Sequence, residues 1–151
     1  MRLSPNFDLS EFTASQYATR FSIDNSPSQP IIDNLTRLCL EVLEPLRLSI
    51  GKPIIISSGY RSPSLNRAVG GSAGSAHMFG LAADIAVPGI TTRNICFQIL
   101  TERIKFDQLI DEFGSWVHVS IAPKNSTNRK QQLEARRQEN GKVIYKQTSF
   151  L

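Results

Sequence analysis

Apolar residues recur at helical spacing in two long segments of the chain. In residues 31–50 they fall at every third or fourth position, and charged residues occupy the opposite side, which predicts an amphipathic helix packed against a core. Pro45 inside this segment has no backbone N–H, so we expect the helix to kink or divide there, and Gly51 to cap its end. Three further helices are predicted at capping residues, and they cover residues 8–12, 62–69 and 91–104.

Shorter apolar or alternating runs predict strands over residues 54–58, 81–87, 106–113 and 116–121. Side chains alternate between the two faces of a strand, so Asp84 and His118 each lie opposite an apolar row of their own strand. Asp84 is also flanked by alanines, which leave room beside it. Since burying an unpaired carboxylate is costly, this position requires a cation or hydrogen-bond donors.

The C-terminal residues support two interpretations. Asn140-Gly141 between alternating runs predicts a β-hairpin over residues 131–146, which is the interpretation we favour. Residues 129–139 all favour a helix, however, so a helix there is the competing prediction. Residues 148–151 either dock against a strand or fray.

Together these elements predict one α+β domain over residues 1–151. Two or three helices are expected on one side of an antiparallel sheet of about four to six strands. The core of the domain covers about residues 5–122, and residues 123–151 form a basic hairpin or extension. A chain of this length buries roughly 70% of its unfolded surface, so it needs no disulfide. Cys39 and Cys96 lie in apolar helical segments and are expected to be free, buried thiols.

The formal net charge of +4 is unevenly distributed. Residues 124–151 hold seven Lys or Arg against two Glu, and the preceding residues sum to −1. Such a tail suits an anionic wall polymer or a nucleic acid, or it is a solvated hairpin without a partner. No apolar run approaches the ~20 residues of a membrane span, and the N-terminus lacks the apolar region of a secretory signal. We therefore expect no membrane insertion, and synthesis in the cytoplasm without a signal peptide.

Two histidines and one aspartate form a complete ligand set for zinc. His77 and Asp84 lie in S-A-H-M-F-G-L-A-A-D-I, and the only other histidine, His118, lies in W-V-H-V-S. Catalytic zinc sites typically take three His and carboxylate ligands and leave a fourth position for water. Two histidines in a chain of 151 residues can also be ordinary residues, so their number alone does not decide between the two interpretations.

Three motifs, in their order along the chain, favour the metal site. They are S-G-Y-R-S at Ser58–Ser62, the pattern S-x-H-x-x-G-x-A-x-D at Ser75–Asp84, and W-V-H-V-S at Trp116–Ser120. In this order they resemble the zinc murein peptidases, which include D-alanyl-D-alanine carboxypeptidases and L-alanyl-D-glutamate endopeptidases of phage lysins. The resemblance covers about residues 5–122 and implies the metal-site fold that these enzymes share with the hedgehog signalling domain. It implies one Zn²⁺, bound by His77, Asp84 and His118 at the edge of the sheet.

The resemblance also assigns roles around the metal. Arg61 directly follows a predicted buried strand, where its guanidinium can hold an anion or pair with a structural carboxylate. In the family the matching Arg contacts the tetrahedral intermediate, which favours a catalytic role for Arg61. We expect Ser75, Tyr60 and Arg61 to bind the substrate.

Hydrolysis also needs a proton acceptor, commonly a carboxylate beside the metal. The family carries an Asp or Glu three residues before the last His ligand, but this chain has Ser115 there. The candidates are Asp111, which we expect opposite His118 if the turn has two residues, and Glu112, which we expect there if it has three. We favour Glu112, because the similar subgroup with Q-L-I-x-E-F-G-x-W-V-H-V-S carries Glu at that place. A carboxylate without function at a strand end is the alternative.

The resemblance thus implies a zinc metallopeptidase of the D-alanyl-D-alanine carboxypeptidase or murein endopeptidase type. We expect it to cleave bonds involving D-amino acids in peptidoglycan stem peptides, as a monomeric, phage-type lytic enzyme that acts on the cell wall after release or virion delivery. Two alternatives come from other classes. Ser115 would suit a catalytically inactive, zinc-stabilised binding module, and the basic tail would suit a nucleic-acid-binding protein, although we expect no nucleic acid as a partner.

Overall fold

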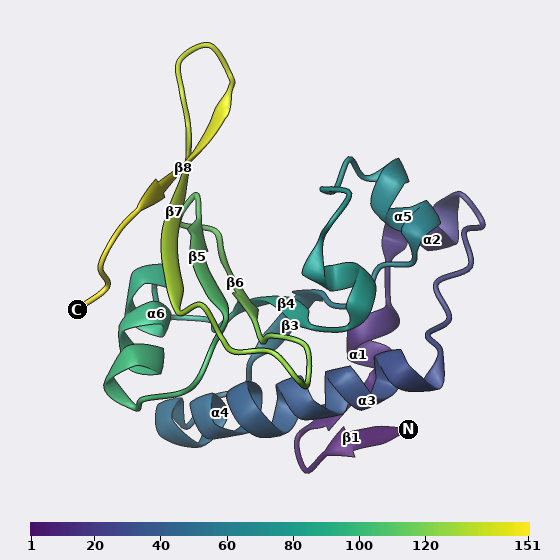
Figure 1. The fold of residues 1–151 in the computed structure, drawn as a ribbon, viewed down its shortest axis with the longest axis horizontal. Helices are drawn as coiled ribbons and strands as arrows, with labels where there is room; N and C mark the ends of the chain where they lie inside the picture. Colours follow the sequence, from purple (N-terminus) through teal and green to yellow (C-terminus); the bar gives the residue numbers. More distant parts are fainter.

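In the computed structural model, which describes residues 1–151, helices cover one face of a six-stranded sheet (Figure 1). The strands follow the sheet order β3 (Ile55–Ser58), β4 (Ala82–Ala86), β6 (Trp116–Ser120), β5 (Gln108–Glu112), β7 (Gln131–Arg137) and β8 (Val143–Gln147). The other elements are β1 (Arg2–Ser4), β2 (Phe7–Asp8), α1 (Leu9–Thr13), α2 (Gln16–Arg20), α3 (Gln29–Leu38), η1 (Cys39–Leu43), α4 (Glu44–Ile50), α5 (Pro63–Ala68), η2 (Ala76–Phe79) and α6 (Thr92–Thr101). The α+β architecture predicted from the sequence is confirmed.

The long amphipathic segment forms one nearly continuous helix, made of α3, the π-helical turn η1 and α4 (Figure 1). In η1 the Glu44 N–H donates to the Cys39 carbonyl, five residues back, which widens the helix directly before Pro45. A widened turn accommodates the missing N–H of proline, so the helix is irregular at the predicted place without being divided. Gly51, at φ 72°, caps the end as predicted.

One strand pair departs from the expected antiparallel sheet. β5 and β7 are parallel, with Gln108 opposite Gln131, whereas the other neighbouring pairs are antiparallel. After β6 the chain crosses back to the start of β5, where the guanidinium and the backbone N–H of Arg129 both donate to the Asp107 carboxylate. β7 therefore starts at the same end of the sheet as β5 and runs in the same direction.

The hydrophobic core lies between the sheet and the helices α3, α4 and α6. Alternate residues of the inner strands enter it, namely Ala83, Ile85, Leu109, Val117 and Val119. Cys39 and Cys96 are buried there and free, as predicted. Burial raises the pKa of the Cys39 thiol to about 12, so this cysteine stays a neutral core residue. The opposite face of the same strands is left for polar side chains.

The predicted C-terminal hairpin is present, and the competing helix over residues 129–139 is wrong. β7 and β8 pair antiparallel, and β7 also pairs with β5, so that Leu133 and Ala135 pack against Ile110. Residues 131–137 form a strand because β5 has backbone N–H and C=O groups on the side away from β6. A neighbouring strand forms hydrogen bonds with these groups, whereas a helix would not. The terminus docks, since the Phe150 side chain is only 3% exposed.

The N-terminal residues hold elements that are too short for a periodic signal. The capping box of α1 is present, with Asp8 accepting from the helix and Glu11 reaching back to it, as expected for the predicted helix start. The β1–β2 hairpin and α2, by contrast, are not evident from the hydrophobic pattern. Across the whole chain, no helix combines the length and the apolar character needed to cross a membrane.

Candidate metal centre

The loop before β4 fixes the position of His77. Ser75 caps the short helix η2 by accepting from the His77 N–H at 3.3 Å. Gly80, at φ 69°, ends η2, and a Cβ there would lie 2.7 Å from the Ile31 carbonyl oxygen, so this turn requires glycine. The His77 ring is 2% exposed, and its Nδ1 lies 2.7 Å from the Gly59 carbonyl oxygen. That carbonyl can only accept, so Nδ1 carries the proton and Nε2 offers its lone pair toward the site.

Asp84 and His118 face each other across the β4–β6 ladder. They are direct register partners, so their side chains leave the sheet on the same face. Asp84 Oδ1 lies 3.2 Å from His118 Nδ1 and 3.3 Å from His77 Nε2. The ligand atoms of the three residues all lie within 4.8 Å of one another, which brings together the set predicted from the sequence.

These residues fit a metal ion in their chemistry as well as in their positions. Burial alone would raise the pKa of Asp84, but the adjacent imidazoles of His118 and His77 outweigh it and hold that pKa well below its usual range. The carboxylate is therefore charged, and a charge in so little solvent calls for a cation. His118 Nε2 is buried without a hydrogen-bond partner. Two imidazoles and a carboxylate are a ligand set that Zn²⁺ takes in catalytic sites.

The site does not lie at the sheet edge, where the sequence led us to expect it. β4 and β6 are the second and third strands in the sheet order, with β3 and β5 outside them. Each of the two strands is therefore hydrogen-bonded on both sides, and its other face packs into the core. A position of this kind holds the ligands more rigidly than an edge strand would.

Arg61 lies beside the metal-ligand candidates and has an unused hydrogen-bond donor. Its backbone N–H donates to the His77 carbonyl at 3.1 Å, and its Nη2 donates to Ser75 Oγ at 3.4 Å. Its Nε is buried and has no partner. Burial lowers the pKa of Arg61, and the negative charge of Asp84 opposes that shift. A desolvated guanidinium with an unused donor is suited to bind an anion that arrives with the substrate.

Arg61 and Ser75 line the same cleft as the three metal-ligand candidates, and this cleft has a volume of about 980 Å³. Tyr60 is 8% exposed and lines a neighbouring hollow of about 490 Å³, together with Arg61 and Asp84. Burial raises the pKa of the Tyr60 phenol. Of the predicted substrate-binding residues, two therefore lie in the main cleft and one lies beside it.

The register around the predicted base differs from our expectation. The β5–β6 turn has three residues, but it places Ile110 opposite His118, and Glu112 opposite Trp116. A three-residue turn shifts the pairing by one residue toward the start of β5, so neither Glu112 nor Asp111 can face His118. Ser115 is exposed in the turn.

Alternation along β5 nevertheless separates the two carboxylates. Glu112 is on the same face as Ile110 and His118 and lines the cleft, whereas Asp111 is on the opposite face and accepts from the Gly114 N–H. Glu112 is 8% exposed, and burial raises its pKa; the nearby His118 ring opposes the shift, and the negative charge of Asp84 adds to it. A buried carboxylate with a raised pKa near a metal site has the properties of a general base.

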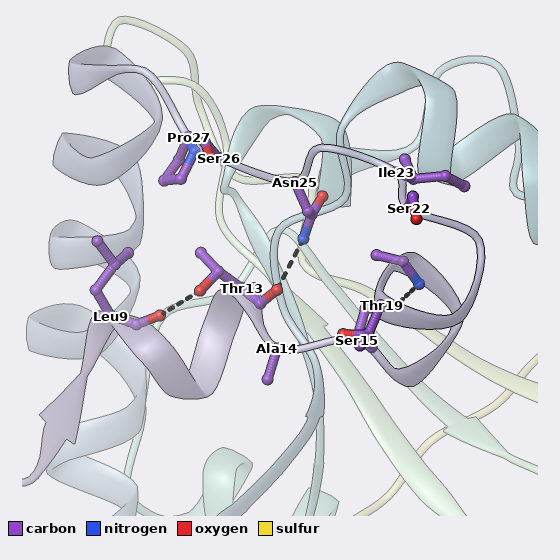
Figure 2. Close-up of a pocket in the computed structure, with 11 residues that line it drawn as sticks. Leu9, Thr13, Ala14, Ser15, Thr19, Ser22, Ile23, Asn25, Ser26 and Pro27 are labelled. Carbon is purple, nitrogen blue, oxygen red and sulfur yellow. Dashed lines mark hydrogen bonds between the residues drawn. The ribbon is translucent and has the colours of Figure 1, made fainter.

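A second hollow, of about 460 Å³, lies between α1, α2 and the loop that follows them (Figure 2). Its lining consists of hydroxyl, amide and small apolar side chains and includes no acid, base or metal ligand. Asn25 in its wall donates to the carbonyls of Thr13 and Tyr60 and accepts from the Ser62 N–H. These bonds hold the loop against the residues on both sides of Arg61, so the hollow belongs to the scaffold of the site.

Sequence reasoning did not identify the cleft residues supplied by the C-terminal hairpin. Five of its residues line the cleft, namely Gln131, Leu133, Arg137, Val143 and Tyr145. The alternating pattern predicts that they share a face of the hairpin, but nothing in the sequence indicates that β7 joins β5.

The comparison with known families agrees with this geometry. Residues 5–120 match the family model described as Peptidase M15. The matched region contains the three metal-ligand candidates together with Arg61 and Glu112, and it ends before the hairpin. No curated protein matches the chain.

Proposed function

The chain belongs to the Peptidase M15 family and is a metallopeptidase, and on that premise we propose that it uses one Zn²⁺ to hydrolyse bonds involving D-amino acids in peptidoglycan stem peptides. The observation that carries the proposal is the convergence of His77, Asp84 and His118, with all ligand atoms within 4.8 Å, in a cleft large enough for a peptide. The three motifs shared with the murein peptidases support the choice of substrate.

Bound Zn²⁺ would supply Lewis acidity, lowering the pKa of water toward ~7 and polarising the scissile carbonyl. In the proposed mechanism, Glu112 accepts the proton of the attacking water and passes it to the leaving amine. The unpaired Nε–H of Arg61 donates to the oxyanion that develops on the carbonyl. Ser75 holds a polar atom of the substrate, and Tyr60 shapes the neighbouring hollow.

Digestion of defined stem peptides tests this function. The full-length chain is loaded with zinc and incubated with muropeptides, and the products are weighed by mass spectrometry. We expect products cleaved at a bond next to a D-amino acid, no products after chelation, and recovery on addition of zinc. The product masses also distinguish a carboxypeptidase from an endopeptidase. Unchanged muropeptides in the presence of stoichiometric zinc would refute the proposal.

A catalytically inactive, zinc-stabilised module is the second candidate, and Ser115 at the family's usual base position favours it. It requires that Glu112 take no part in chemistry, although Glu112 lines the cleft with a raised pKa. Tight zinc binding without hydrolysis of any muropeptide would support this second candidate over the first.

The wider role that we propose is that of a monomeric, phage-type lytic enzyme that reaches the wall after release or as part of a virion. Its excess of basic residues in the tail suits the anionic polymers of bacterial walls. Loss of turbidity of purified cell walls, compared with walls stripped of their anionic polymers, measures this activity. Equal rates on both kinds of wall would show that the basic tail does not act by binding the anionic polymers.

A further inference from the structure

The C-terminal hairpin lies outside the region matched by the family, yet it forms one wall of the metal cleft. Residues 5–120 match the family, and β7 and β8 follow at 131–147. Leu133, Arg137 and Tyr145 nevertheless line the same cleft as the metal-ligand candidates. A feature of this chain, rather than of the matched core, therefore shapes the space where the substrate binds.

The strand register connects the hairpin directly to the proposed base. Trp116, Glu112, Ala135 and Tyr145 are consecutive partners across β6, β5, β7 and β8, so all four side chains leave the same face of the sheet. Ala135 between Glu112 and Tyr145 is small and buried, which leaves the Tyr145 ring free to lean toward the cleft. Partial burial raises the pKa of the Tyr145 phenol, and the charges of Glu112 and Asp84 add to the shift, as expected for a phenol near both carboxylates.

Arg137 is the cleft arginine of the hairpin that lacks an acidic partner. Arg129 pairs with Asp107, and Arg136, on the other face of β7, pairs with Glu134. Arg137 instead lies over the Phe113 ring at 5.3 Å and donates to the Gly141 carbonyl.

An aromatic surface adjoins this unpaired cation. The Phe113 ring packs edge-on against the Trp116 ring at 5.8 Å, and Trp116 begins the row that ends at Tyr145. This end of the cleft thus offers two aromatic rings and a guanidinium whose remaining donors are free for a carboxylate.

We propose that the hairpin is a substrate-binding wall in which Arg137 binds a carboxylate of an acidic peptide and Tyr145 packs against the peptide backbone beside Glu112. This inference rests on the proposed function, and it names a free carboxylate as a specificity determinant of the substrate. Stem pentapeptides with lysine at the third position, used as probes, carry two such groups, at the C-terminal D-alanine and at the α-carbon of D-glutamate, and the experiment distinguishes them.

The test compares Arg137→Gln with Arg136→Gln, which makes the same charge change one residue away on the opposite face. Three stem pentapeptides serve as probes: one with free carboxylates, one amidated at the C-terminus and one amidated at D-glutamate. We expect Arg137→Gln to lower kcat/KM about tenfold, or roughly 1.4 kcal/mol, on the free peptide. The loss should disappear on the one probe whose bound carboxylate is blocked. Arg136→Gln should match the wild type on all three.

Tyr145 is tested on the same probes. Tyr145→Ala should lower kcat/KM on all three probes by a similar factor, because the contact of the ring with the peptide backbone does not depend on which carboxylate is amidated. Ile144→Ala, whose side chain leaves the other face of β8, is the control. Thermal unfolding of each variant confirms that the fold is retained, as expected for exposed residues.

The result does not depend on turnover. If the zinc-loaded wild type cleaves no probe, the complex persists, and the same comparisons are made with Kd values from calorimetry. If Arg137→Gln then weakens binding of the probes, the hairpin is supported as a substrate-binding wall. The proposed hydrolysis is refuted independently, because no probe is cleaved. Equal values for Arg137→Gln and Arg136→Gln, or no binding of any probe, would overturn the inference.

Discussion

Side chains from two parts of the sheet line the cleft: those of the inner strands β4 and β6, and those of the outer hairpin β7–β8. The two groups differ strongly in their exposure to solvent. The side chains of Asp84 on β4 and His118 on β6 are only 16% and 11% exposed, and their surroundings hold charged groups in fixed positions. Tyr145 on β8 is 57% exposed, and Arg137 is exposed as well. Chemistry that depends on desolvation and rigidity therefore belongs to the inner strands, whereas contacts with a variable substrate belong to the rim.

The largest expected effect comes from removing a ligand at the inner strands. His118→Ala should abolish peptidase activity and weaken zinc binding by more than the roughly 100-fold typical of outer partners, because it removes one of three donors. Zinc competition with a chromogenic chelator measures the affinity. Gln147→Ala is the matched control, because Gln147 ends the cross-strand row of His118 at the exposed edge. If His118→Ala retained zinc at wild-type affinity, His118 would not be a ligand.

Replacement of the proposed base should separate chemistry from metal binding. Glu112→Gln is expected to lower kcat by about 10²- to 10⁴-fold while zinc stays bound, since the amide cannot accept the proton. Single-turnover digestion and metal analysis of the same sample measure the two properties. Asp111→Asn, the neighbour on the opposite face, should retain activity. The reverse result, with Asp111→Asn inactive and Glu112→Gln active, would show that Asp111 and not Glu112 is the base.

The pH dependence offers a smaller but specific test of the inner site. Burial raises the pKa of Glu112, and only its deprotonated form accepts a proton. The rate should therefore fall as the pH drops through this raised pKa, with a midpoint in kcat/KM above the ~4.3 of an ordinary glutamate. A stopped assay in a constant-ionic-strength buffer series measures the midpoint. If the acid limb of the kcat/KM profile has its midpoint at or below the ordinary glutamate pKa, a group other than Glu112 controls the rate.

The smallest expected effect on activity comes from the C-terminal residues that follow the hairpin. Phe150 is buried beneath the Arg93 guanidinium, so Phe150→Ala should lower the free energy of unfolding by about 3 kcal/mol through the cavity it leaves. Zinc affinity should not change, because the ligands lie on other strands. Denaturant unfolding and zinc competition measure the two quantities. A parallel loss of zinc affinity would show that the packing of the C-terminal segment and the metal site form one cooperative unit.

Much of the candidate site is predictable because it depends on local chemistry. The lone pairs of His77, Asp84 and His118 and the alternation that turns Asp84 away from the apolar row are both properties of short segments. The choice between Asp111 and Glu112 is not, because it depends on which residue faces which across a turn. A turn of three residues with two left-handed positions, Phe113 and Gly114, places Glu112 rather than Asp111 on the same face of the sheet as His118.

The sequence by itself determined the longer helices and the strands of the large sheet, because hydrophobic periodicity acts over a few residues. Its three motifs indicated the ligand types and the class of enzyme. Only the tertiary structure decided that the site lies on inner strands, that β7 joins β5 in parallel, and that the hairpin walls the cleft. Each of these depends on contacts between residues far apart in the chain, such as Arg129 with Asp107 or Ala135 with Glu112. Such contacts depend on the packing of the whole chain, which local patterns do not encode.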